Sequence, residues 1–361
     1  MSRSASKLRK AVVMVTLAVG LGIAVAACGS GGDDDDGGSG DSTIRFAFSP
    51  DPAWNWIEDQ GILSEMEEDS GITIKRFETE DEYAAFAGGH ADIVSTGTYE
   101  TPVLEAETGV DTVTIGKFNR AQDIAVSDPA NNYNTFDDLP EGCKVGVESF
   151  QGSSLVWQAL IADMHGRELA QGSDDLQMAV TDFEVTPELV VKGDLCAGLT
   201  AMTTSIPYLM DESVHVMYDG QNASQLYEQE YVPGHEGMNS NNFVTLESWY
   251  SEHPEEVAFF LEVWDVAMQE WKENRDEIIE GDPENFGYTS DEELKFVQDY
   301  YENTYDNFLD TVYLDPEWIE GEMGVNQILR DAEIVPADAP DPIYVCIDPE
   351  TGEESCRFPE S

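Results

Sequence analysis

Positive charge is scarce in this sequence. Its 361 residues include 17 Lys and Arg against 74 Asp and Glu, which gives a formal net charge of −57. A polyanion of this strength is repelled by nucleic-acid phosphates and by anionic lipid headgroups. Sequence-independent binding to either is therefore excluded as the main role, and we expect no nucleic-acid partner. The hydrophobic content of 41% nevertheless indicates a folded chain.

Histidine is also scarce, and its spacing does not indicate catalysis. The 5 His residues lack the spacing of metal ligands, and no Ser-His-Asp order is marked by a nucleophile elbow. Asp123 and Glu148 could form a pair of carboxylates, but among 74 acids such pairs arise by chance. We therefore predict that the protein is not an enzyme and uses no cofactor and no metal.

Long apolar runs are absent after residue 27. Before it, four basic residues precede an apolar run over 11–27, which is the pattern of a secretory signal. This run of 17 residues is short for a membrane-spanning helix, and no later stretch approaches the ~20 residues that a span requires. We therefore expect a signal peptide over 1–27 and a mature chain without a transmembrane span.

The expected signal ends in the sequence VAACG, whose cysteine is Cys28. This ending resembles the bacterial lipobox, in which the cysteine is acylated and becomes the new N-terminus. An ordinary signal peptide with a coincidental cysteine is the alternative. Residues 28–42 read as a flexible acidic tether of Gly, Ser and Asp, which favours the lipoprotein. The resemblance implies an extracytoplasmic protein, anchored to the outer face of the cell membrane by the lipid on Cys28.

Removal of the signal makes the chain still more acidic. Four of the 17 cations lie in 1–27, so 13 remain against 74 acids and the formal charge becomes −61. Two interpretations compete: an acidic binding surface, or a surface that stays hydrated in concentrated salt, where screening shortens to ~3 Å at 1 M. The acids are scattered through every segment, which favours the salt-adapted surface.

Four cysteines remain after Cys28, and we predict that they form two structural disulfides. Cys346 and Cys356 flank a turn-rich segment, so they can close a small C-terminal loop. Cys143 and Cys196 each begin a predicted strand, and a bridge between neighbouring strands is geometrically reasonable. Four free buried thiols are the alternative, and neither pair has metal-ligand spacing.

Short β patterns alternate with helical patterns from Ser42 onward. Such alternation predicts an α/β fold with parallel strands, and ligands bind beyond the C-terminal ends of such strands. The expected strands are 43–48, 72–77, 92–95, 112–117, 122–127, 144–148, 177–183, 197–203 and 214–218, and the expected helices are 54–67, 81–87, 153–165, 187–192 and 253–271.

Five local motifs follow one another along this part of the chain. They are AGGHADI at 87–93, FDDLPEGCKVGV at 136–147, GSS at 152–154, KGDLCA at 192–197 and HPEEV at 253–257. In this order they resemble the periplasmic binding protein type 2 fold, in particular the nitrate/sulfonate/taurine and thiamine-precursor group of transporter substrate-binding proteins. Cys196 stands where that family usually has Asp, and the tail beyond Val335 lies outside the resemblance.

The resemblance implies two lobes, two hinge crossings and a helical C-terminal part, with the ligand trapped as the lobes close. The expected parts are lobe 1 at 43–123 and 218–335, lobe 2 at 124–217, and a tail with a disulfide loop at 336–361. The implied function is that of a solute-binding lipoprotein of an ABC importer, with permease and ATPase subunits as partners. A lipoprotein that binds a thiamine-type pyrimidine precursor, or a ligand-sensing partner of a surface signalling protein, is the alternative.

Loops at the C-terminal ends of the expected strands supply the ligand candidates. Arg120 is one of the 13 mature cations, and its guanidinium suits a carboxylate, sulfonate or nitrate, although a surface salt bridge is the alternative. A helix that begins near Ser153 presents unpaired N–H groups, although plain N-capping is the alternative there. We predict a small anion or zwitterion such as a sulfonate, taurine or nitrate. The candidates are Trp54, Asn55, Thr96, Gly97, Thr98, Tyr99, Asn119, Arg120, Phe150, Gly152, Ser153, Ser154, Thr204 and Tyr208.

Overall fold

The computed structural model describes most of the chain from Ser42 onward. The described ranges are 42–48, 51–78, 82–97, 100–150, 152–234, 238–336 and 339–359. They belong to one unit, residues 41–361. Cys28, the expected signal and tether, and the candidates Thr98 and Tyr99 lie outside them. None of the helices in these ranges has the length and apolar composition needed to cross a membrane.

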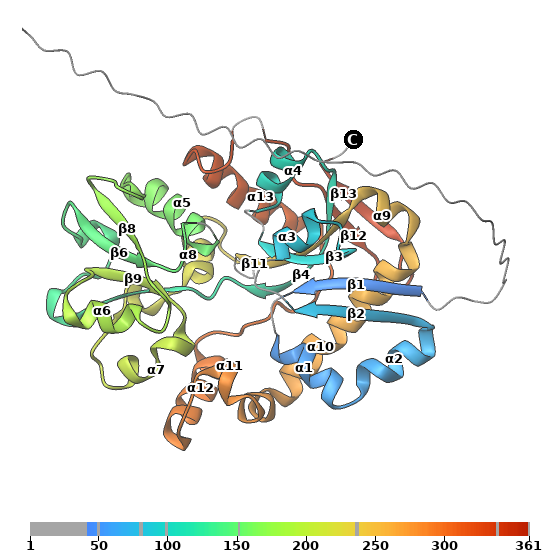
Figure 1. The fold of residues 1–361 in the computed structure, drawn as a ribbon, viewed down its shortest axis with the longest axis horizontal. Coiled ribbons are helices and arrows are strands. Elements are labelled where there is room, and N and C mark those ends of the chain that lie inside the picture. Colours follow the sequence, from blue (N-terminus) through green and yellow to red (C-terminus); the bar gives the residue numbers. More distant parts are fainter. Residues whose placement is uncertain are drawn as a thin grey trace, which may run out of the picture. The chain divides into compact units, whose positions relative to one another are not determined.

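The strands form two sheets, and the predicted α/β class is confirmed (Figure 1). The first sheet has the order β13-β12-β4-β11-β3-β1-β2 and the second has the order β10-β5-β9-β6-β8-β7. The strands of the first sheet are β1 (Ser42–Phe48), β2 (Ile72–Glu78), β3 (Ile93–Gly97), β4 (Thr112–Arg120), β11 (Asn239–Leu246), β12 (Tyr344–Ile347) and β13 (Glu354–Phe358). Those of the second are β5 (Ile124–Ser127), β6 (Cys143–Val147), β7 (Leu169–Ala170), β8 (Leu176–Val180), β9 (Ala197–Thr200) and β10 (His215–Val216).

Both sheets contain parallel strands, as the alternating pattern predicts. In the first sheet β1 pairs in parallel with β2 and β3, and in the second β6 pairs in parallel with β8 and β9. Parallel strands bring their C-terminal ends to one edge, where ligand-binding loops gather. The prediction missed β11, which runs antiparallel between β3 and β4, because residues 239–242 are Asn and Ser and hide the strand pattern.

Helices cover the sheets and connect their strands. They are α1 (Pro52–Asp59), α2 (Ile62–Ser70), α3 (Glu82–Ala87), α4 (Thr101–Thr108), α5 (Ser153–His165), α6 (Thr186–Lys192), α7 (Met202–Met210), α8 (Ala223–Glu230), α9 (Glu247–Glu252), α10 (Pro254–Gly281), α11 (Pro283–Phe286), α12 (Asp291–Asn303) and α13 (Pro316–Asp331), with short 3-10 turns at Pro129–Asn131, Phe136–Asp138 and Tyr218–Gly220.

Two element predictions need correction. The single helix expected at 54–67 is divided into α1 and α2, because Gly61 adopts a left-handed φ of 76° between them. The strand expected at 197–203 ends at Thr200, and the chain continues as α7. Within this turn the hydroxyl of Ser205 donates to the carbonyl oxygen of Ala201 at 2.9 Å, which satisfies a backbone acceptor at the start of the helix.

Aromatic side chains form the centre of the larger core. Trp264 of α10 is fully buried, and its ring lies 4.9 Å from that of Phe243 in β11 and 5.1 Å from that of Trp54 in α1. A second buried cluster surrounds Trp157 of α5 and also receives Leu329 of α13. The larger cluster includes residues of both sheets, such as Phe46 of β1 and Val126 of β5, and the helical C-terminal part contributes to both clusters.

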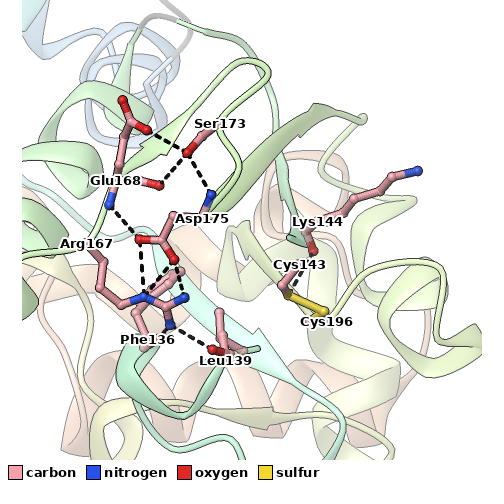
Figure 2. Close-up of polar contacts among 9 residues, drawn as sticks. All are labelled: Phe136, Leu139, Cys143, Lys144, Arg167, Glu168, Ser173, Asp175 and Cys196. Atoms are coloured by element: carbon pink, nitrogen blue, oxygen red, sulfur yellow. Dashed lines mark hydrogen bonds and ion pairs between the residues drawn. A yellow bond between two sulfur atoms is a disulfide. The ribbon is translucent and has the colours of Figure 1, made fainter. Parts of the chain in front are cut away.

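Both predicted disulfides are present. Cys143–Cys196 joins the start of β6 to the residue just before its neighbouring strand β9. Cys346–Cys356 joins β12 to β13. Figure 2 shows the first bridge near a polar cluster in which Arg167 forms an ion pair with Asp175. The same guanidinium donates to the carbonyl oxygens of Phe136 and Leu139, so it fastens the loop before β6 to the end of α5.

The chain passes from the first sheet to the second through a short link and returns through a longer one. β4 ends at Arg120 in the first sheet, and β5 begins at Ile124 in the second, so only three residues connect them. The return runs from β10 through α8 to β11. The first link places residues 121–123 at the boundary of the two sheets.

Candidate ligand-binding cavity

A cavity of about 400 Å³ is lined by segments that belong to both sheets. This volume lies within the range of about 300–1,000 Å³ that is typical of small-molecule sites. The described residues on its wall are Asp51, Pro52, Glu100, Phe118, Asn119, Gln122, Asp123, Glu148, Gly152, Ser153, Phe183, Ala201, Thr203, Ser240, Asn241, Asn285, Phe286, Tyr301 and Asn307. The loop before α1, the link between β4 and β5, and the start of α5 thus meet at one space.

Three of the predicted ligand residues line this cavity: Asn119, Gly152 and Ser153. Asn119 lies near the end of β4, and its side-chain oxygen accepts the N–H of Asn241 in β11 at 2.9 Å. Gly152 has a φ of 66° immediately before α5, a conformation that glycine adopts without steric cost. Gly152 and Ser153, both part of the GSS motif, therefore bring the first turn of α5 to the cavity.

Other predicted residues have structural partners instead. Trp54 is fully buried in the aromatic core, and the side-chain oxygen of Asn55 accepts a hydrogen bond from Arg76 at 3.1 Å. The hydroxyl of Thr204 donates to the carbonyl oxygen of Ala201 at 3.0 Å. The described wall does not include Trp54, Asn55, Thr96, Gly97, Arg120, Phe150, Ser154, Thr204 or Tyr208.

Arg120 supports the segment that carries Asn307. Its guanidinium donates to the carbonyl oxygen of Asp306 at 3.0 Å and to that of Phe308, which flank Asn307 on either side. The N–H of Arg120 also donates to the carbonyl oxygen of Asn307 at 2.9 Å. Arg120 therefore holds a short stretch of backbone beside the cavity.

The wall carries negative charge. Its four ionisable carboxylates are Asp51, Glu100, Asp123 and Glu148, and no Lys, Arg or His occurs among its described residues. Asp51 and Glu100 precede helices α1 and α4 beside the first sheet, whereas Glu148 follows β6 of the second. The negative charge therefore reaches the cavity from both sheets.

Asp123 lies in the link between β4 and β5, and its pKa is raised to about 6. Burial is the largest cause, and the negative charge of Glu148 adds to it. A hydrogen bond from the hydroxyl of Ser153 opposes the rise because it favours the charged carboxylate. Burial and a like charge thus make Asp123 take up a proton at a higher pH than an exposed aspartate does.

Asp51 caps α1, and the pKa of its carboxyl group is also raised. Its Oδ1 accepts the N–H groups of Ala53 at 2.9 Å and Trp54 at 3.2 Å, as an N-cap does. These bonds lower its pKa, but burial outweighs them and raises the pKa to about 7. The side chain of Glu100 is held differently, since its Oε2 accepts from the Thr96 hydroxyl and the Gly97 N–H, each at 2.9 Å.

Neutral groups complete the wall. Phe118, Phe183, Phe286 and Tyr301 supply aromatic surface. Asn307 is 7% exposed, and its side-chain oxygen has no hydrogen-bond partner among the described residues. A buried acceptor without a donor is costly, so a donor group that reaches this oxygen would stabilise the site.

Sequence reasoning missed most of the wall for identifiable reasons. Asp51 and Asp123 lie close in sequence to the predicted residues Trp54 and Arg120, but among 74 acids no single acid is informative. Asn285, Phe286 and Asn307 lie in the C-terminal part, where no motif precedes them. Only the packing of α11 and of the segment after α12 brings them to the cavity.

Comparisons with known proteins support the fold. No family model and no curated protein matches the sequence. Among solved structures, an alkanesulfonate-binding protein from Xanthomonas axonopodis pv. citri, bound to MOPS, has a TM-score of 0.61 at 14% identity, over 82% of this chain and 94% of that one. The fold is that of a periplasmic binding protein.

Two further structures agree with this assignment. The periplasmic aliphatic sulphonate binding protein from Escherichia coli has a TM-score of 0.63 at 14% identity, over 83% of this chain and 90% of that one. A Candida albicans protein described as having the generic periplasmic binding protein fold has a TM-score of 0.58 at 16% identity, over 83% and 92%. The periplasmic binding protein fold predicted from the five motifs is thus confirmed.

Proposed function

We propose that this protein is the extracytoplasmic solute-binding component of an ABC importer. It captures a small solute in the cavity and delivers it to a membrane permease that an ATPase drives, and it catalyses no reaction itself. The observation that carries the proposal is the cavity of about 400 Å³ with wall residues from both sheets. The sulfonate-binding proteins of the same fold support the role as neighbours.

The position of the link between β4 and β5 supports capture by closure. Gln122 and Asp123 lie in this link and also line the cavity, so a bound solute contacts the segment about which the two sheets can move. Hinge closure of two domains around a ligand is a common mechanism of solute capture. Solute binding and movement of the lobes are therefore coupled through the same residues.

The lipid on Cys28 belongs to the same proposal. A tether of Gly, Ser and Asp over 28–42 gives the folded unit reach from the membrane to its permease. The formal charge of −61 on the mature chain fits a surface that stays hydrated in a salty medium outside the cell.

The wall of the cavity gives an anionic solute little support. A sulfonate or nitrate would meet four carboxylates, and no Lys, Arg or His lies among the described wall residues to balance its charge. A thiamine-type pyrimidine precursor is the better of the earlier alternatives. Its amino group can donate to a carboxylate, and its ring can lie against Phe183 or Phe286.

A test of the capture role needs no knowledge of the solute. We expect the full-length chain, purified in mild detergent and kept at constant salt, to retain a small molecule that native mass spectrometry detects and that denaturation releases. Adding that molecule back should reduce the radius of gyration in small-angle scattering, because the lobes close. A chain that neither retains nor binds any small molecule from an extract of its source cells would contradict the proposal.

A further inference from the structure

We infer that the captured solute is a small organic cation that carries N–H donors. The inference rests on the proposed capture role and names the chemical class of its solute. Its basis is the complement of groups on the cavity wall, which offers four carboxylates and several side-chain amides but, among the described residues, no basic side chain.

The carboxylates are placed so that one ligand can contact acids from both sheets. Asp51 and Glu100 enter from the first sheet, Glu148 enters from the second, and Asp123 lies in the link between them. A cation between these groups is attracted from both sides, and the attraction increases as the lobes approach. The energy of binding therefore favours the closed arrangement.

Asn307 supplies an independent indication of a donor. Its side-chain oxygen is buried and lacks a hydrogen-bond partner among the described residues, although it lies on the wall. Leaving such an acceptor unpaired is energetically costly. An ammonium, amidinium or guanidinium N–H of the solute would pair with it, whereas a sulfonate or nitrate has only acceptor oxygens to offer.

The size and chemistry of the wall favour an organic cation over a metal ion. Within the described ranges, no group of three or more His, Cys, Asp or Glu is arranged to hold a metal ion. The cavity of about 400 Å³ is also far larger than one ion needs. Phe118, Phe183 and Phe286 add aromatic surface, on which alkyl groups pack and cations are attracted to ring faces.

A salt-adapted surface does not explain the buried acid on the wall, Asp51. A salt-adapted surface needs carboxylates that are exposed to water, whereas Asp51 is only 6% exposed. A buried carboxylate gives no hydration benefit and is costly when it is charged. Independently of the acids on the outer surface, a solute that enters the cavity meets the negative charge of the cavity wall.

The decisive experiment separates solutes by charge. An extract of the source cells is divided on ion-exchange resins into cationic, anionic and neutral fractions, and each is added to the stripped full-length chain at one fixed salt concentration. We expect the cationic fraction alone to raise the melting temperature. Putrescine and agmatine serve as defined probes, and ethanesulfonate and a hydroxymethyl-aminopyrimidine as anionic and neutral controls.

Variants locate the effect in the cavity. Glu148→Gln and Asp123→Asn should each weaken binding of the active cation at least tenfold in calorimetry. Glu252→Gln removes one exposed charge outside the cavity and should leave the affinity within twofold, which controls for non-specific attraction to an acidic protein. Because Glu148 is exposed, its variant is expected to fold even if the Asp123 variant does not.

The outcomes separate this inference from the capture role. Stabilisation by the anionic or the neutral fraction alone would overturn the cation and leave capture intact. Equal loss of affinity in the Glu252 variant would also overturn it, because the attraction would then belong to the whole surface. If no fraction stabilises the chain, both the inference and the capture role fail.

Discussion

Asp123 and Glu148 line the same cavity, and the negative charge of Glu148 contributes to the raised pKa of Asp123. Burial contributes more, and together they bring that pKa to about 6 despite the hydrogen bond from Ser153. Two like charges on one wall repel each other until an opposite charge arrives. A cation in the cavity would therefore favour the charged form of Asp123, so binding and deprotonation are linked.

The affinity for a cation should rise between pH 5 and pH 7. Asp123 loses its proton around pH 6 and Asp51 around pH 7, so both groups become charged over this range. Glu100 and Glu148 complete the ionisable groups of the described wall. We expect calorimetry with putrescine at pH 5, 6 and 7 to show an increase of at least fivefold, and Asp123→Asn to reduce it. A flat profile would contradict the role of Asp123.

The same group should destabilise the empty protein at high pH. Its folded pKa of about 6 exceeds the unfolded value, so the folded state holds the proton more tightly and stability falls as the pH rises between about 4 and 6. Asp123→Asn removes this loss. We expect the variant to gain up to about 3 kcal/mol in urea unfolding at pH 8 and nothing at pH 3, since both forms are then neutral. A gain that is equal at both pH values would show a packing effect instead.

Arg120 should act on stability rather than through the charge of the solute. Its guanidinium donates to the carbonyl oxygens on both sides of Asn307, and charged hydrogen bonds contribute about 1.5–3 kcal/mol each when their partners would otherwise be unpaired. Arg120→Ala should lower the free energy of unfolding by about 2 kcal/mol. If stability is unchanged while an anion loses affinity tenfold, Arg120 binds solute after all.

How far the sequence predicts the structure differs between the fold and the site. The helix at 153–165 was predicted with both of its bounds, because Gly152 precedes it and Gly166 ends it with a left-handed φ of 62°. Such local signals do not depend on the rest of the chain. Of the residues predicted to bind the ligand, Asn119 near the end of β4 and Gly152 and Ser153 at the start of α5 line the cavity.

The remaining wall residues depend on tertiary packing. Phe286 and Asn307 follow no motif and reach the cavity only because α10, α11 and α12 fold back toward the second sheet. Asp123 and Glu148 were visible as a pair in the sequence, but their significance depends on burial and on the absence of a nearby cation from the described wall. Residue spacing predicts neither the burial of these acids nor the charges around them, because 74 acids are scattered along the chain.

The two disulfides should stabilise the fold unequally. Cys143–Cys196 spans a sequence separation of 53 and Cys346–Cys356 one of 10. Loop-closure entropy predicts about 4 kcal/mol for the longer loop and about 3 kcal/mol for the shorter. Replacing each pair by alanines should therefore lower the free energy of urea unfolding more for the first pair. The opposite order would indicate that the C-terminal hairpin supports the first sheet more than loop entropy alone predicts.

Gly287 should control how closely the two sides of the cavity approach. It ends α11 with a φ of 66°, and a Cβ atom at this position would lie closer than 3.0 Å to the carbonyl oxygen of Thr203 in α7. Asn285, Phe286 and Thr203 all line the cavity, so Gly287→Ala forces its wall apart. We expect the affinity for the captured solute to fall at least tenfold, and the compaction on binding to decrease in small-angle scattering.

Gly109→Ala is the matched control for this prediction. Gly109 also ends a helix with a left-handed φ, of 68°, but a Cβ atom there meets nothing within 4 Å. Both variants bear the cost of about 1 kcal/mol for a side chain in this conformation, and Gly287→Ala bears the clash with Thr203 in addition, so it should lose more stability than Gly109→Ala. Only Gly287→Ala should lose affinity. Equal affinities in the two variants would show that the contact between α11 and α7 is not part of the ligand-bound state.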